Sequence, residues 1–309
     1  MTSDSSTPGP QRPTSYYGQP IIKPPVWKSE IPAYFFTGGL GGVASTLALG
    51  ARLSGNDVLA RRASLAAGAA LGVSPMFLIR DLGRPRRFLN MFRVFKVTSP
   101  MSVGSWLLGA AGSAAGTSAV LELSGLFPRL QRLTGGAAGV LGPGVATYTG
   151  GLLAQSVVPV WHEARHELPL LFGASAAAAA GGAAAVLTPA AAAAPARRLA
   201  LAGAVTELVA QRAMEKRLGA LAAEPYTRGR AERYSKLGER LMLAGVGLMA
   251  VAGRRRAGAV VAGSLLMGGS LAQRFAVVHA GMISAEDPKY TTLPQRERAE
   301  AHGSRAQTR

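Results

Sequence analysis

Long apolar stretches alternate with short polar segments along most of this 309-residue chain. A helix of roughly 20 apolar residues crosses a hydrocarbon core about 30 Å thick, and six stretches reach that length. They cover residues 31–53, 62–80, 101–124, 137–159, 167–188 and 257–280. Each predicts a transmembrane helix, the last one despite Arg274 near its end.

Two further segments have a weaker pattern. Residues 198–217 carry Glu207 and Arg212, and residues 237–253 hold only a short uninterrupted apolar run. Counting both gives about eight transmembrane helices, an all-α polytopic membrane protein, arranged as two four-helix bundles. An alternative stays open, in which the charges of the first segment mean that its span is misplaced.

The two ends of the chain differ from this pattern. Residues 1–30 are rich in Pro, Ser and Gly, which favours an extended tail. Residues 284–309 are polar and charged, which predicts a flexible tail. The transmembrane helical domain is therefore expected over residues 31–283.

Composition supports a membrane protein. The 57 alanines and 39 glycines fill nearly a third of the chain, and charged residues make up 16% against a usual share of about 25%. Small residues let helix backbones approach closely in a bilayer. The absence of cysteine excludes disulfides, thiolate zinc sites and cysteine-ligated iron–sulfur clusters. Electrons therefore cannot be carried by a cluster held in this chain.

The net charge of +18 would suggest nucleic-acid binding in a soluble protein. Here the basic residues lie almost wholly between the apolar stretches, so we expect membrane lipids and not nucleic acid as the partner. The side that holds both termini has 23 Lys and Arg residues, against 10 on the other side. Because cytoplasmic loops are enriched in Lys and Arg, both termini are predicted to be cytoplasmic, in the cytoplasmic membrane of a bacterium.

One polar segment is unusually specific. It lies within residues 78–106, LIRDLGRPRRFLNMFRVFKVTSPMSVGSW, between the second and third predicted spans. Gly83 and Pro85 break the helix, and Ser99-Pro100 marks the start of the next one. Asp81 can bond to exposed backbone N–H groups or pair with a nearby arginine. The alternative is a basic loop that binds anionic lipid headgroups.

DLGRPRRF (81–88) and SPMSVGSW (99–106) resemble the NrfD-like membrane subunits of polysulfide reductase type. WKSEIPAYFFTGGLGGVAS (27–45) and PGVATYTGGLLAQSVVPVW (143–161) agree with that family as well. The resemblance covers roughly residues 16–175. It implies a haem-free, quinone-binding anchor that works with a ferredoxin-like iron–sulfur subunit and a molybdopterin-type catalytic subunit.

The resemblance therefore implies a subunit that is not catalytic alone, in an oxidoreductase complex of polysulfide, formate or nitrite reductase type. It would exchange electrons between the iron–sulfur partner and menaquinone or ubiquinone, with proton transfer as an additional option. The histidines agree with the absence of haem. His162 and His166 share a loop, His279 lies at a helix end and His302 lies in a tail, so no opposed pair exists within the membrane.

Candidate quinone ligands lie near the cytoplasmic ends of the predicted helices or within them. Tyr148 belongs to YTGGLL, which resembles the family segment that supplies a quinone-contacting tyrosine. The candidate quinone residues are Tyr34, Tyr148, Glu30, Asp81 and Arg84. The expected partner-docking and structural motif comprises Asp81, Gly83, Arg84, Pro85, Arg87 and Asn90. Glu122 and Glu207, ionisable groups in or near apolar spans, are candidates for a proton path.

Two other functions stay open. Residues 162–166 spell His-Glu-Ala-Arg-His, a match to HExxH, in which two histidines on one helix face bind zinc and the glutamate activates water. Pro159 and Pro169 leave barely two helical turns for it, and no third ligand is evident, so no metal site is predicted. A multi-span transporter would also fit eight helices, but the two halves show no convincing repeat.

Overall fold

The computed structural model describes residues 21–84 and 86–296. In this part of the chain every regular element is a helix, which confirms the all-α prediction. The eight long helices are α1 (Glu30–Leu53), α2 (Asp57–Asp81), α4 (Pro100–Ser124), α5 (Pro128–Ala154), α7 (Leu168–Leu187), α8 (Ala194–Ala223), α9 (Gly229–Ala252) and α10 (Arg256–Glu286). The short elements include α3 (Arg87–Asn90), α6 (Pro159–Glu163) and the 3-10 helix η1 (Glu224–Thr227).

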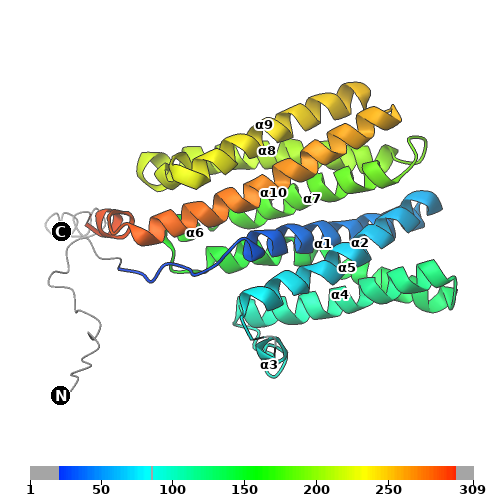
Figure 1. The fold of residues 1–309 in the computed structure, drawn as a ribbon, viewed down its shortest axis with the longest axis horizontal. Coiled ribbons are helices and arrows are strands. Elements are labelled where there is room, and N and C mark those ends of the chain that lie inside the picture. Colours follow the sequence, from blue (N-terminus) through cyan, green and yellow to red (C-terminus); the bar gives the residue numbers. More distant parts are fainter. Residues whose placement is uncertain (1–20, 85, 297–309) are drawn as a thin grey trace, which may run out of the picture.

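The long helices form two four-helix bundles, as predicted (Figure 1). The first contains α1, α2, α4 and α5, and the second contains α7, α8, α9 and α10. Helix α7 packs against both α1 and α5, and α10 also contacts α1, so these helices join the two bundles. The start of α1, the end of α2, the start of α4 and the end of α5 lie at the same end of the molecule as the end of α10 (Figure 1), and we call this end the termini side.

Local signals set the helix ends. The Asn56 side chain accepts a hydrogen bond from the Leu59 N–H at the start of α2, and Ser99 caps α4 in the same way, just before Pro100. Such caps satisfy backbone donors that have no partner within the helix. Helix α4 ends at Ser124 and is capped by Gly125, whose φ of 68° is the left-handed conformation that glycine adopts without strain.

The two weaker segments are both long helices, with 30 residues in α8 and 24 in α9. Helix α8 is interrupted at Gly219, where φ is 70° and ψ is −177°. Helix α5 begins at Pro128, well before the apolar stretch predicted from residue 137, because its first turns carry arginines that apolar patterning overlooks. Apolar patterning thus locates the membrane-compatible part of a helix better than its end.

The chain from residue 284, expected as a flexible tail, is mostly helical as far as residue 296, the last that the structure describes here. Helix α10 continues to Glu286, and residues 289–296 form another short helical stretch. Tyr290 in this stretch is buried, and its hydroxyl donates to Glu224 at 3.1 Å. The polar composition of this segment predicted a flexible tail because the contact of Tyr290 depends on η1, which is distant in sequence.

Glycines bring the helices close together. A Cβ atom on Gly142 of α5 would lie 2.2 Å from the Gly42 carbonyl oxygen of α1. A Cβ atom on Gly263 of α10 would lie 2.5 Å from the Gly182 carbonyl oxygen of α7. Each contact requires a residue without a side chain, which is the role expected for small residues between membrane helices.

Among the described helices, α2, α7 and α10 are long and apolar enough to cross a membrane, judged by length and composition. The other five long helices contain 24 to 30 residues. At 1.5 Å per residue this length also exceeds a hydrocarbon core of about 30 Å. Their interiors are diluted by glycine, serine or charged residues.

Candidate functional site

Two tyrosines meet in the first bundle at its termini side. Tyr34 lies in the second turn of α1 and Tyr148 near the end of α5, and their hydroxyl groups are hydrogen-bonded to each other. Tyr34 is buried and Tyr148 is half-buried. The two residues that the quinone prediction emphasised are therefore brought together.

Backbone contacts from two further helices fix this pair. The Tyr148 ring lies against Gly104 of α4, where a Cβ atom would be 2.3 Å from the ring atom Cδ2. The Ser74 hydroxyl of α2 donates to the Tyr34 carbonyl oxygen at 3.3 Å. Phe77 and Leu78 of α2 pack against the cluster of buried residues that contains Tyr34. All four helices of the first bundle thus contribute to the tyrosine site.

An aromatic cluster connects this end of the first bundle to the second. Trp27, just before α1, stacks on Trp161 of α6 with ring centroids 5.3 Å apart. It also meets Phe35 edge to face at 6.2 Å, and Phe35 meets Phe172 of α7 at 5.9 Å. The buried Trp161 donates from Nε1 to the Val277 carbonyl oxygen at 2.8 Å. These contacts were not predicted, because no sequence spacing relates residues so far apart.

Glu30 and Asp81 lie close to each other at the same end. Asp81, the last residue of α2, faces the Lys28 backbone and the Glu30 carboxylate. Gly83 has a φ of 67°, so the chain turns sharply after Asp81. Arg84 is exposed in that turn, where its backbone N–H donates to the Leu82 carbonyl oxygen at 2.8 Å.

The rest of the DLGRPRRF motif leaves the bundle. Arg87 and Asn90 belong to α3 and are exposed. Figure 1 shows α3 beside the start of α4, projecting away from the second bundle. Pro85 lies outside the described residues.

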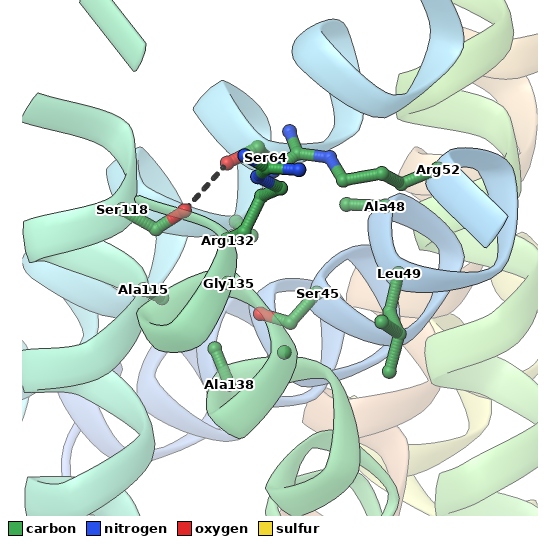
Figure 2. Close-up of a pocket in the computed structure, with 12 residues that line it drawn as sticks. Ser45, Ala48, Leu49, Arg52, Ser64, Ala115, Ser118, Arg132, Gly135 and Ala138 are labelled. Atoms are coloured by element: carbon green, nitrogen blue, oxygen red, sulfur yellow. Dashed lines mark hydrogen bonds between the residues drawn. The ribbon is translucent and has the colours of Figure 1, made fainter. Parts of the chain in front are cut away.

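Glu122 lies at the opposite end of the first bundle. Its carboxylate accepts from Arg52 of α1 at 2.8 Å and from Gln131 of α5 at 2.6 Å. Ser118 of α4 and Ser64 of α2 extend this polar cluster with a hydroxyl contact at 3.4 Å (Figure 2). A cavity of about 20 Å³ lies among these helices, enough for about one water molecule.

Glu207 occupies the interior of the second bundle, facing Arg274. Both are almost fully buried, with 2% and 1% of their surface exposed. Arg274 donates from Nη2 to the Phe172 carbonyl oxygen at 2.7 Å, and its guanidinium lies 3.8 Å from the centre of the Phe172 ring. Among the described residues, Glu207 Oε2 and Arg274 Nε and Nη1 have no hydrogen-bond partner. The cluster thus keeps polar atoms free in an apolar interior.

The HExxH match does not form one helical face. Helix α6 ends at Glu163, and Ala164 caps it, so His162 and His166 do not lie on consecutive turns of one helix. In the described ranges, no three His, Asp or Glu side chains gather as metal ligands would. His279 stacks on Tyr234 with parallel rings 5.5 Å apart. The geometry gives no support to a zinc protease.

Comparison with known families agrees with the motifs. The family model described as polysulfide reductase, of NrfD type, matches residues 13–286, which is most of the chain. No curated protein matches the chain. The family match extends beyond the region of the four sequence motifs into the second bundle. It indicates a membrane subunit that associates with other oxidoreductase subunits. The chain belongs to the NrfD-type polysulfide reductase family.

Proposed function

We propose that this protein is the quinone-binding membrane anchor of an oxidoreductase complex. The observation that carries the proposal is the Tyr34–Tyr148 pair, located at the end of the bundle that also holds Asp81 and the DLGRPRRF turn. Electrons would pass between an iron–sulfur partner and menaquinone or ubiquinone at this end. The quinone supplies the redox chemistry, and this chain supplies binding and orientation.

The chemistry of the tyrosine pair supports quinone binding. A phenol hydroxyl can donate to a carbonyl oxygen, and two hydroxyls on separate helices can turn from each other towards the two carbonyls of a quinone. Tyr148 is half-buried, so the pair is not sealed inside the core. Leu107 and the α2 residues Phe77 and Leu78 provide apolar surface nearby for the tail.

The ferredoxin-like iron–sulfur subunit, which would exchange electrons with a molybdopterin-type catalytic subunit, would dock on the turn formed by Asp81, Gly83 and Arg84. Arg87 and Asn90 lie at the rim of that surface. The proposed docking surface and the tyrosine pair share one end of the first bundle, which supports electron transfer between a subunit docked there and the quinone. By the Lys and Arg count this end faces the cytoplasm.

Glu122 and Glu207 would serve proton delivery at different places. Glu122 lies at the opposite end of the first bundle beside a small cavity. Glu207 lies inside the second bundle, and its Oε2 atom is buried without a hydrogen-bond partner. A water molecule bound to this atom would itself be buried. Ionisable residues inside spans are costly, which favours a functional reason for both.

Purification from native membranes tests the proposal. The preparation is expected to contain bound quinone, detected by solvent extraction, together with an iron–sulfur protein. Tyr34→Phe and Tyr148→Phe are expected to lower quinone occupancy, whereas the control Tyr234→Phe, in α9, is not. A monodisperse preparation with neither quinone nor an iron–sulfur protein would refute the proposal.

A further inference from the structure

Residues 86–97 form an arm outside the first bundle, which we call the α3 arm. Several of its apolar side chains are exposed: Leu89, Phe95 and Val97 are 68%, 58% and 75% exposed. Figure 1 shows that the arm lies sideways from the bundle, next to α4. Neighbouring large apolar groups this exposed indicate a surface that meets something other than water.

The arm is fixed to the outer face of α4. The Phe92 ring packs over Gly109, where a Cβ atom would lie 2.7 Å from ring atom Cε1, and it meets Trp106 edge to face at 5.6 Å. The Ser102 hydroxyl donates to the Val94 carbonyl oxygen at 3.0 Å. Gly109 lies nine residues into α4, about 13 Å along the helix from its start. The arm therefore follows the side of a membrane helix and does not merely cover its end.

Charge distinguishes the arm from an ordinary apolar surface. It carries four exposed basic residues, Arg86, Arg87, Arg93 and Lys96, and no acidic residue. Between the arm and α4 lies a groove of about 210 Å³. Its walls include Met91, Val94 and Met101, and Lys96 lies at its edge with Ser102. The groove thus combines apolar walls with a cation and a hydroxyl.

We propose that the α3 arm and the first turns of α4 bind an anionic phospholipid. Arg93 and Lys96 bind the headgroup phosphate, and one acyl chain lies in the groove along Met91, Val94 and Met101. Exposed basic and aromatic residues beside apolar ones are typical of segments that lie in the membrane interface. The start of the arm, with Arg87 and Asn90, lies at the rim of the proposed protein-docking surface, whereas Phe92 lies against Gly109 on the side of α4. This lateral position favours a lipid as the ligand of the part of the arm that follows Asn90. The proposal stands independently of quinone binding.

Lipid binding to the full-length protein tests this site. The protein is delipidated in uncharged detergent, and its affinity is measured for phosphatidylglycerol, for phosphatidylcholine and for inorganic phosphate. We expect clear preference for phosphatidylglycerol and no measurable binding of phosphate alone. Arg93→Gln combined with Lys96→Gln is expected to weaken phosphatidylglycerol binding by about 10- to 30-fold, since each cation near an anionic surface contributes roughly fivefold.

Two further variants separate the contributions. Arg230→Gln with Arg233→Gln removes two exposed cations from α9 on the same side of the protein, and it should leave phosphatidylglycerol binding unchanged. Val94→Ser with Met101→Ser should weaken binding of the long-chain lipid more than of a short-chain analogue, because it alters the groove. All variants are compared only after monodisperse elution.

Three results would overturn the proposal. Equal affinity for phosphatidylglycerol and phosphatidylcholine would remove the role of the cations. An equal loss of phosphatidylglycerol affinity in the α9 control would show that the effect depends on the total charge of the protein and not on the arm. Unchanged lipid binding in the arm variant, combined with loss of a co-purifying iron–sulfur protein, would show that the arm docks a protein instead.

Discussion

Replacing Gly104 with alanine tests how tightly the tyrosine site is built. The new Cβ atom would lie 2.3 Å from Cδ2 and 2.4 Å from Cε2 of Tyr148. Carbon atoms in contact normally lie about 3.5–4.0 Å apart, so the ring or the helix must move by more than about 1 Å. Because the Tyr148 hydroxyl is hydrogen-bonded to the hydroxyl of the buried Tyr34, displacing the Tyr148 ring also breaks this hydrogen bond.

The energetic cost follows from two opposing effects. Inserting a methyl group into a packed interior costs about 1–3 kcal/mol, and alanine gains about 1 kcal/mol over glycine in a helix. We therefore expect net destabilisation of up to about 2 kcal/mol. Gly116→Ala is the matched control, since it lies on the same helix and its Cβ atom would meet nothing within 4 Å. That variant should be neutral or more stable by up to about 1 kcal/mol.

Thermal unfolding in one detergent, followed by tryptophan fluorescence, gives the stability order of the three proteins. Quinone titration then shows whether Gly104→Ala weakens binding to the extent that Tyr148→Phe does. Combining Gly104→Ala with Tyr148→Ala should remove the clash, so the alanine at position 104 should stabilise the protein in that background. If Gly104→Ala is as stable as Gly116→Ala and binds quinone normally, the packing argument fails.

Three other changes are expected to have measurable effects. Arg274→Met should cost about 1.5–3 kcal/mol in thermal unfolding because it removes the charged hydrogen bond to the Phe172 carbonyl oxygen, and an unchanged unfolding midpoint would contradict the role of that bond. The hydrogen bond from Lys289 holds the pKa of Glu224 below its ordinary value. Lys289→Gln should therefore speed hydrogen exchange in residues 288–294 at a pH above the ordinary glutamate pKa of about 4.3. This difference between the two proteins should vanish as the pH falls through the lowered pKa of Glu224. Trp161→Phe should cost about 1–2 kcal/mol through loss of the bond to the Val277 carbonyl, and an unchanged unfolding midpoint would argue against that bond.

Several features of the fold follow directly from the sequence. Apolar runs of sufficient length predict six of the eight long helices, because backbone groups inside a bilayer must be satisfied within each helix. The other two, α8 and α9, correspond to the segments with a weaker apolar pattern. Pro100 and the Ser99 cap mark the start of α4, and Gly125 marks its end. These signals are local, so they need no knowledge of which helices are neighbours.

Contacts between helices are less predictable. Glu122 was a candidate, but its partners Arg52 and Gln131 come from two other helices, and an arginine at the end of a span resembles any flanking charge. Trp27 belongs to a segment expected as a tail, yet it stacks on Trp161. In helices rich in alanine and glycine, no strong apolar stripe identifies the face that packs against other helices. Which helices become neighbours therefore depends on the shape complementarity of their backbones.

The aromatic contacts between the bundles give the second bundle a connection to the tyrosine site. The Tyr34 and Phe35 rings lie 5.5 Å apart, Phe35 contacts Phe172, and the guanidinium of Arg274 lies on that same ring. A charge facing Glu207 is therefore separated from the tyrosine pair by two packed rings. Movement of Tyr34 towards a ligand must disturb this packing, because interiors at normal density have no free space to absorb it. A double-mutant cycle between Tyr34 and Arg274, measured on stability with and without quinone, would show whether this contiguity carries coupling energy, which proximity alone does not establish.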